Sequence, residues 1–212
     1  MTVPPLELRG RSTAVVTIDL HRGHLDPDVA TMPLPAERSR QVTDTNATFN
    51  KAMRAAGIPV VHVVTAYRNV EEISGNPWWA TVAGTSASRR NVLRHQLPES
   101  PGLAVMPEVI EPEDMTVWTK KRYDCFLHTD LEHALRSLGI DTLLLTGVNT
   151  SSCVIATAIA ASVRDFATVV VSDCVATMDE SLHEPALAVI RGAFGWVMTS
   201  DEIIAQLGQG AA

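Results

Sequence analysis

The sequence predicts an α/β fold in three layers: a doubly wound, Rossmann-like and mostly parallel sheet of about six strands, with helices on both faces. Two features carry this prediction. Short apolar stretches of strand length alternate with longer stretches of helical length, the pattern of a parallel sheet with crossover helices. Some short stretches, such as 143–145 and 169–171, are continuously apolar, as strands buried on both faces are. We expect one domain over 1–212.

The N-terminal part of the chain begins this alternation. We expect a strand, a polar loop, a helix and a second strand, at 14–18, 20–28, 37–56 and 58–65. Gly23 and Pro27 interrupt the loop, and apolar residues spaced along one face of the helix end at Gly57.

The stretch 68–113 does not follow the alternation. It contains a Trp-Trp pair, several prolines and one possible short helix over 90–95. A connection this long inside a compact α/β domain usually has a function, so we expect it to cover a site and to contact the substrate. Its fold is not predicted.

The alternation then resumes to the C-terminus. We expect strands at 115–119, 142–146, 167–172 and 196–198. The intervening helices begin at capping signals, Ser or Thr followed three residues later by Glu, at Thr129, Ser181 and Thr199. A further helix follows the polar stretch 149–152 and contains Cys153 in its first turn.

Composition and charge exclude several classes of function. A net charge of −7 without a basic stripe argues against nucleic acid as a partner. The apolar runs are too short to span a membrane, and the N-terminus lacks a signal-peptide core, so we expect a cytoplasmic protein. Three cysteines without CxxC spacing indicate reduced thiols rather than disulfides or a zinc site.

In doubly wound folds the ligand lies beyond the carboxyl ends of the strands. This rule places together Asp19, Tyr67 or Arg68, Lys120, Cys153 and Asp173. A thiol in the first turn of a helix has a lowered pKa there, which favours a nucleophile. The alternative, a buried cysteine acting as a small apolar residue, stays open on these residues alone.

Three blocks of sequence add a resemblance. The first, 14–19, ends in Asp19; the second, 119–126, reads Thr-Lys-Lys-Arg-Tyr-Asp-Cys-Phe; the third, 145–157, contains Cys153. In this order the blocks resemble the isochorismatase-like cysteine hydrolases, which include nicotinamidases, N-carbamoylsarcosine amidase and ureidoacrylate amidase. The resemblance covers nearly the whole chain except 68–113.

The resemblance implies a catalytic triad of Cys153, Asp19 and Lys120, with Lys120 favoured over Lys121 by the alignment of the second block. It implies an oxyanion hole formed by the backbone N–H groups of Asn149 and Cys153, with a cis bond before Asn149. The implied activity is hydrolysis of a non-peptide C–N bond in a small amide, carbamoyl or ureido compound through a Cys thioester. No cofactor is implied, and family members are commonly homo-oligomers, dimers or tetramers.

Departures from the family pattern reduce the number of activities that we expect. His21 stands where glutamine is common, and 65–72 lacks the histidine pair that binds metal in nicotinamidases, so we expect no metal. Alternatives remain: the same fold hydrolysing an ester, a cyclic amide or an isochorismate-type vinyl ether, though Cys153 argues against the last. A non-catalytic small-molecule-binding module is disfavoured because no G-x-G-x-x-G or P-loop follows any strand.

Several side chains near the motifs are candidates for contact with the substrate. Arg68 is a candidate clamp for a substrate carboxylate, and the aromatic residues are candidate walls of the pocket. Each has a structural alternative, as a surface, core or subunit-interface residue. The candidate substrate-binding residues are Arg68, Trp78, Trp79, Tyr123, Phe126 and His21.

Overall fold

The computed structural model describes residues 4–208, which form one six-stranded sheet in the order β3-β2-β1-β4-β5-β6. The strands are β1 (Thr13–Ile18), β2 (Val60–Thr65), β3 (Met115–Lys120), β4 (Thr142–Val148), β5 (Ala167–Ala176) and β6 (Trp196–Met198). Every neighbouring pair is parallel. The predicted α/β fold class is confirmed.

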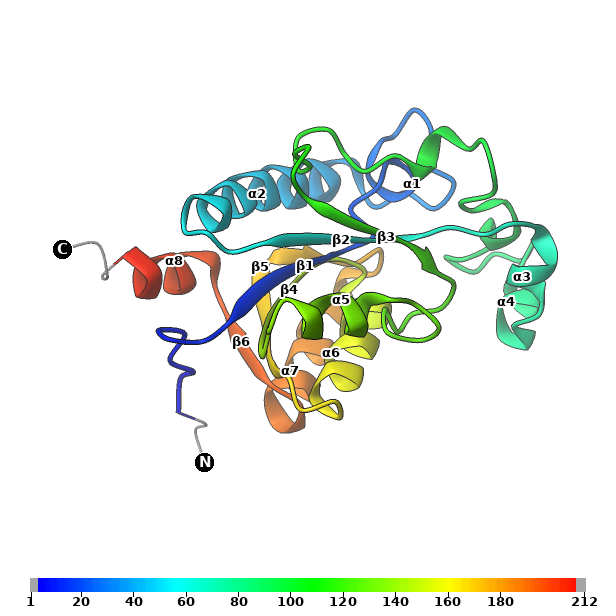
Figure 1. Ribbon diagram of the computed structural model, residues 1–212. Coiled ribbons are helices and arrows are strands. Elements are labelled where there is room, and N and C mark those ends of the chain that lie inside the picture. Colours follow the sequence, from blue (N-terminus) through cyan, green and yellow to red (C-terminus); the bar gives the residue numbers. More distant parts are fainter. Residues whose placement is uncertain (1–3, 209–212) are drawn as a thin grey trace.

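Helices cover both faces of this sheet (Figure 1). They are α1 (Arg22–Leu25), α2 (Ala36–Ala55), α3 (Val70–Ser74), α4 (Pro77–Val82), α5 (Leu131–Ser137), α6 (Ile155–Ser162), α7 (His183–Ala193) and α8 (Ser200–Gly208). Helices α2 and α8 cover one face, and α5, α6 and α7 cover the other. Neighbouring strand residues point to opposite faces, so Val15 packs in the cluster of Phe49 from α2, whereas Val16 packs in the cluster of Leu135 from α5.

The strand order creates a crevice at the carboxyl edge of the sheet. Chain connections run outward from β1 in one direction through β2 and β3, and from β4 in the other through β5 and β6. The point between β1 and β4 is therefore the topological switch point, where doubly wound folds bind their ligands. Asp19 directly follows β1, and Cys153 lies in the turn that follows β4.

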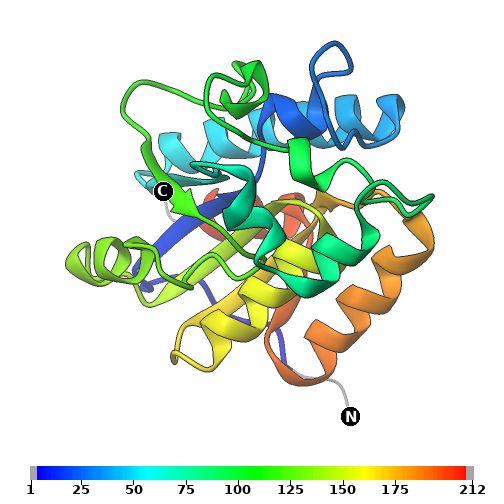
Figure 2. The ribbon, with the colours of Figure 1, turned by 90° about the vertical axis from the view of Figure 1, so that its right-hand side faces the viewer.

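The stretch 68–113 folds over this edge, as Figure 2 shows from that side. It contains α3, α4 and two short 3₁₀ helices, Val92–Arg94 and Pro101–Leu103. Backbone contacts attach it to the sheet: the N–H of Tyr67 donates to the carbonyl of Gln96 at 2.9 Å, and Val105 pairs with His21 in an isolated antiparallel bridge.

Two local predictions were wrong. The loop predicted over 20–28 contains one helical turn, α1, which is held against the long connection because Arg22 N–H donates to the carbonyl of Ala104 at 2.8 Å. Strand β5 continues to Ala176, so Asp173 lies within the strand instead of at its end. There it accepts a hydrogen bond from the backbone N–H of Ser200 at 2.8 Å and caps α8, away from the other strand ends.

Among residues 4–208, no helix combines the length and the apolar character needed to cross a lipid bilayer.

Candidate active site

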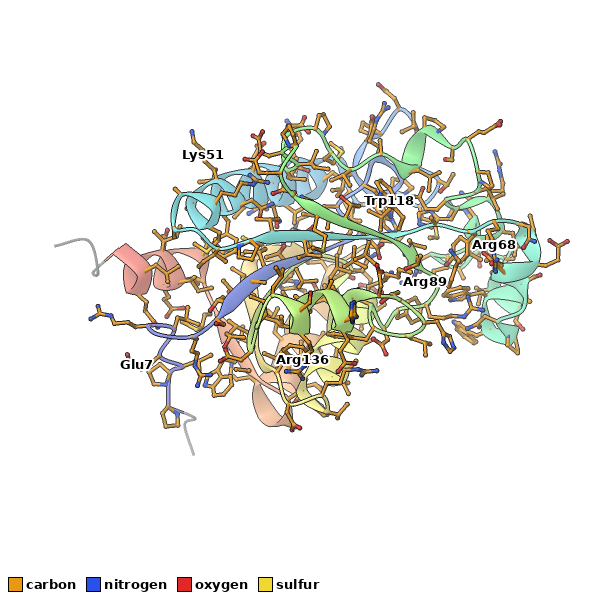
Figure 3. The ribbon with its side chains drawn as sticks, viewed as in Figure 1. Glu7, Lys51, Arg68, Arg89, Trp118 and Arg136 are labelled. Carbon is orange, nitrogen blue, oxygen red and sulfur yellow. The ribbon has the colours of Figure 1, made fainter. Side chains whose placement is uncertain are left out.

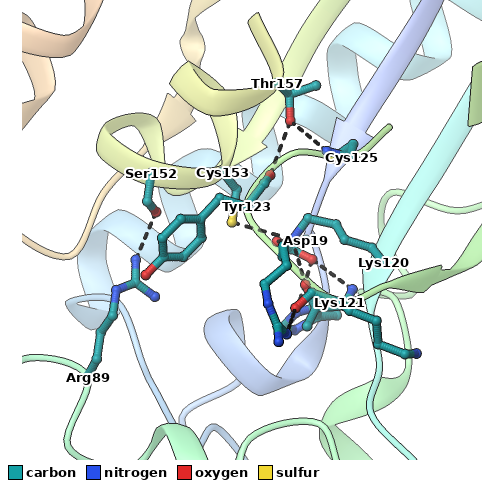
Figure 4. A network of polar contacts seen from close by, with 12 residues as sticks. Asp19, Arg89, Lys120, Lys121, Tyr123, Cys125, Ser152, Cys153 and Thr157 are labelled. Carbon is teal, nitrogen blue, oxygen red and sulfur yellow. Dashed lines mark hydrogen bonds and ion pairs between the residues drawn. The ribbon is translucent and has the colours of Figure 1, made fainter. Parts of the chain in front are cut away.

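Asp19, Lys120 and Cys153 meet at the switch point of the sheet (Figure 4). The ammonium Nζ of Lys120 donates to Asp19 Oδ2 at 2.6 Å and to Cys153 Sγ at 3.4 Å. Asp19 directly follows β1, and Lys120 is the last residue of β3. Cys153 lies in a π-helical turn, Thr150–Val154, that leads into α6. All three are buried. The structure thus brings together the three residues that the motifs single out.

Thr65, at the end of β2, holds the Asp19–Lys120 pair in place. Its backbone N–H donates to Asp19 Oδ1 at 2.8 Å, and its hydroxyl accepts from Lys120 Nζ at 2.6 Å. Since a lysine ammonium has three donors, those of Lys120 are fully used by Asp19, Thr65 and Cys153. Lys121 points elsewhere, because its Nζ donates to the carbonyl of Ala66.

The two charges of this pair stabilise each other in a buried place. Burial alone would raise the pKa of Asp19, but the adjacent charge of Lys120 outweighs it and holds the pKa well below its usual range. For Lys120, burial would lower the pKa, and the negative charge and hydrogen bond of Asp19 raise it above its usual value instead. Both groups are therefore ionised at neutral pH.

The expectation of a lowered pKa for Cys153 was wrong. Burial raises the pKa of its thiol, and the attraction of Lys120 does not compensate, partly because the Asp19 carboxylate next to it opposes a second negative charge. Cys153 is consequently a thiol in the resting site, beside a carboxylate that can accept its proton.

The last residues of β4, before the turn that carries Cys153, lie tightly against β1. Gly147 has a φ of +102°, and a Cβ on it would lie 2.1 Å from the carbonyl oxygen of Ile18, so only glycine fits. The next peptide bond, Val148–Asn149, is cis. The carbonyl of Asn149 then accepts the N–H groups of Ser152 and Val154 at 3.0 and 3.1 Å, which shapes the turn that carries Cys153.

A cavity of about 20 Å³ adjoins Cys153, with Asp19 and Lys120 also in its wall. That volume holds about one water molecule. Two of the predicted aromatic residues line it: the indole Nε1 of Trp79 donates to the hydroxyl of Tyr123 at 2.8 Å. The long connection contributes the outer wall through Trp79, Arg89 and His95.

The other predicted substrate-binding residues lie outside this wall. Arg68 is 85% exposed and pairs with Glu72 one helical turn away, so it is a surface residue (Figure 3). Trp78 is 64% exposed, because the helical turn of α4 directs it outward while Trp79 points inward. Phe126 stacks on Phe166 in the core below the sheet. For these residues the structural alternative holds.

Arg89 is a wall residue that the sequence did not single out. Its guanidinium donates to Ser152 Oγ at 2.8 Å and lies over the ring of Tyr123 at 4.9 Å from the centroid (Figure 4). It is placed at the cavity by the fold of the long connection, which has no periodic pattern from which its position follows.

Three buried histidines lie beside Asp19. His21 Nε2 is 3.7 Å from Asp19 Oδ1, and His24 and His95 belong to the cavity wall. Burial lowers the pKa of His21 to about 3 and that of His24 to about 4, and it lowers the pKa of His95 well below its usual value. All three imidazoles are neutral at pH 7. Of the three, only His21 was a predicted site residue, and His95 lies in the connection whose fold was not predicted.

Comparison with known proteins agrees with this architecture. The Isochorismatase domain model matches residues 13–202. The chain is 29% identical over 199 residues to a maleamate amidohydrolase of Pseudomonas putida, covering 93% of this chain and 88% of that one. It is 30% identical over 214 residues to a ureidoacrylate amidohydrolase of Methylobacterium radiotolerans, covering 91% and 78%.

Solved structures match along the whole chain. A cysteine hydrolase from Pseudomonas syringae pv. phaseolicola has the same fold, with a TM-score of 0.85, 21% identity and 99% of both chains covered. An isochorismatase family protein from Burkholderia thailandensis superposes with a TM-score of 0.74 at 28% identity, over 98% of both chains. The fold, the motifs and the family model lead to one conclusion: this chain belongs to the isochorismatase family of hydrolases.

Proposed function

We propose that the protein is a cysteine amidohydrolase that cleaves the C–N bond of a small amide, carbamoyl or ureido compound through a thioester on Cys153. The observation that carries the proposal is the buried contact of one ammonium, Lys120, with both the Cys153 sulfur and the Asp19 carboxylate, at 3.4 and 2.6 Å. A thiol beside a carboxylate held in its charged form is a nucleophile with its general base.

In the first half-reaction the thiol proton of Cys153 passes to the Asp19 carboxylate while Sγ attacks the carbonyl carbon of the substrate. The carbonyl oxygen becomes an oxyanion, which the backbone N–H groups of Asn149 and Cys153 stabilise. When the tetrahedral intermediate collapses, the C–N bond breaks. The leaving nitrogen takes the proton from Asp19, and an acyl thioester remains on Cys153.

In the second half-reaction a water molecule attacks the thioester carbon and gives a proton to Asp19. The C–S bond breaks, the acid product leaves, and the proton on Asp19 returns to the sulfur of Cys153. The sum is amide plus water to acid plus amine or ammonia. Throughout both steps the ammonium of Lys120 keeps Asp19 anionic when it must act as a base.

Arg89 identifies the kind of substrate more narrowly. Its guanidinium lines the cavity and donates to Ser152, in the turn of Cys153, and a guanidinium binds carboxylates through paired hydrogen bonds. The other arginine of the wall, Arg122, donates instead to the backbone carbonyls of Glu72 and Lys121. We assign to Arg89 the role of carboxylate clamp that was predicted for Arg68. The relatives support a substrate that carries both an amide and a carboxylate, since maleamate and ureidoacrylate, which they are named for, both do.

The first experiment is intact-protein mass spectrometry of the wild type and Cys153→Ala, each incubated with a panel of small amide, ureido and carbamoyl acids. We expect turnover by the wild type alone and an acyl mass on Cys153 when hydrolysis is slowed. Cys125→Ala is the matched control, because Cys125 is also buried but lies outside the cavity wall. Turnover that survives in Cys153→Ala rejects the thioester mechanism.

A second experiment tests the carboxylate. For Arg89→Gln we expect KM for an amide acid to rise on the order of 10- to 100-fold, as for the loss of a charged hydrogen bond, with a smaller change in kcat. The same amide without its carboxylate should be hydrolysed equally by both proteins. If Arg89→Gln lowers kcat/KM equally for both substrates, Arg89 does not bind the carboxylate.

A further inference from the structure

His21, His24 and His95 form a cluster beside the cavity, and His24 and His95 line it. His21 directly precedes α1, and His24 lies within it. His95 comes from the long connection, far away in the sequence. One ring nitrogen from each lies within 4.8 Å of the other two. All three side chains are buried. Three imidazoles gathered out of solvent require partners, since each ring has two polar nitrogens.

The outer nitrogens of two of these rings are held by oxygen atoms. His24 Nδ1 lies 2.7 Å from the carbonyl oxygen of Met32, and His95 Nδ1 lies 2.7 Å from the hydroxyl of Thr31. A carbonyl only accepts, so Nδ1 of His24 carries the proton and its Nε2 keeps a free lone pair. A histidine fixed through one nitrogen by such an oxygen, with the other nitrogen free, is the usual arrangement of a metal ligand.

His21 has no such partner. Among residues 4–208, neither of its ring nitrogens has a hydrogen-bond partner, although the side chain is fully buried. Burying a polar group without a partner is unfavourable, so its persistence calls for a ligand. Stacking on His24, with ring centroids 4.7 Å apart, brings this unpartnered imidazole into the cluster but satisfies neither nitrogen.

The backbone around the cluster is fixed in advance of any ligand. His21 is in the bridge with Val105, and the carbonyl of Gln96, next to His95, accepts the N–H of Tyr67 at 2.9 Å. Gly23 allows the two segments to approach, since a Cβ there would lie 2.4 Å from Gln96 Oε1. A site held this way needs only side-chain rotation to bind an ion.

We propose that His21, His24 and His95 bind one divalent transition-metal ion of the zinc class. Zinc binds imidazole nitrogens at about 2.0–2.1 Å, which puts tetrahedral ligand atoms about 3.4 Å apart, so the nitrogens must approach one another by up to about 1.4 Å. Three nitrogen ligands without a carboxylate favour zinc, nickel, copper or cobalt over magnesium and calcium. This cluster is not the nicotinamidase site, whose histidine pair is missing from 65–72, because two of its ligands follow β1 and not β2. The proposal therefore departs from the expectation of no metal.

The position of the ion would connect it to the cavity. Three ligands leave the fourth tetrahedral position open, and His24 and His95 belong to the wall that faces Cys153. We place the ion there as an anchor for an oxygen of the substrate. The Asp19 carboxylate, 3.7 Å from His21, offsets part of its charge.

The test is a binding measurement that does not depend on amidase activity. The full chain, stripped with a chelator and dialysed, is titrated with Zn²⁺ by calorimetry and with Co²⁺ by absorption spectroscopy. We expect one ion per chain and a tetrahedral cobalt spectrum without a thiolate charge-transfer band. His24→Gln and His95→Gln should each weaken binding on the order of 100-fold or more, because each removes a ligand outright. His133→Gln, an exposed histidine on α5, is the matched control and should bind as the wild type does.

Three results would overturn the proposal. They are a wild type that binds no ion stoichiometrically, binding that both His24→Gln and His95→Gln retain, and binding that Cys153→Ala abolishes. Circular dichroism checks that each variant is folded. If neither histidine variant folds, the cobalt spectrum of the wild type decides, since a thiolate band or an octahedral spectrum rejects the three-histidine site.

Discussion

Replacing Lys120 by Met tests whether the buried ion pair organises the site. In Lys120→Met, the Asp19 carboxylate keeps the Thr65 N–H but loses its counter-charge and one hydrogen bond of 2.6 Å. Removing one partner of a buried ion pair costs about 3–5 kcal/mol, because the other charge stays buried without compensation. We therefore expect the free energy of unfolding to fall by about that amount at pH 7, together with loss of activity.

A double-mutant cycle separates the pair from the packing of the two side chains. Asp19→Asn leaves the ammonium of Lys120 with only Thr65 and Cys153. The double variant has no buried charge at this place, so it should be less destabilised than the sum of the single variants, by about 2–3 kcal/mol. The assay is urea unfolding of the four proteins at pH 7, with equal m-values as the condition for comparing midpoints.

The effect of pH on the free energy of unfolding should differ in sign between the wild type and Lys120→Met. In the wild type the pKa of Asp19 is held below its unfolded value, so the pair contributes stability that is lost as pH falls below about 4. Without Lys120, burial raises that pKa, and the destabilisation of Lys120→Met should shrink as pH falls from 7 to 4. Two results would refute this account of the pair. One is that the destabilisations of the two single variants add up to that of the double variant within about 0.5 kcal/mol. The other is a destabilisation of Lys120→Met that grows as pH falls.

Gly147→Ala should lower the free energy of unfolding by more than about 3 kcal/mol, because φ is +102° and the new Cβ would meet the carbonyl oxygen of Ile18. The control is Gly139→Ala, which also has a positive φ but has open space around it, and it should cost only about 1–2 kcal/mol. Urea unfolding measures both. Iodoacetamide should modify native Cys153 slowly at pH 7 and faster as pH rises through 9, because burial raises its pKa; peptide mapping that shows full labelling at pH 6 would contradict this. Burial alone would raise the pKa of Asp114, but hydrogen bonds from His62 and Arg54 hold it below its usual range, so this carboxylate contributes stability that is lost as pH falls below about 4. Asp114→Asn should therefore cost about 3 kcal/mol at pH 7, and this cost should begin to shrink once pH falls below about 4, by the same unfolding assay.

The parts predicted from sequence are those that local patterns determine. Apolar runs and capping signals located the strands and most helices, and the rule for strand ends brought Asp19, Lys120 and Cys153 to one edge. Arg68 and Asp173 were misplaced because that rule depends on where a strand stops. Strand β5 runs past Asp173, and Arg68 begins a turn that points to solvent.

The long connection accounts for most of what was missed. Arg89 and His95 reach the cavity through backbone contacts such as the hydrogen bond from Tyr67 to Gln96, and no periodicity in 68–113 announces such contacts. The pKa of Cys153 was predicted in the wrong direction for a related reason. A helix terminus is visible in the sequence, whereas the depth at which the thiol is buried depends on the whole assembled fold.

The Lys120 ammonium has all of its hydrogen-bond acceptors only when several strands of the sheet are in place. They belong to the segments that end β1, β2 and β4, while the lysine itself ends β3. In a partly folded chain that lacks one of these segments, the ammonium is either buried with an acceptor missing or left in water. In both cases Lys120 is not held in order beside Cys153. Strands β1 to β4 and the reactive centre should consequently form together, so that a folding intermediate with a half-built sheet carries no misdirected nucleophile.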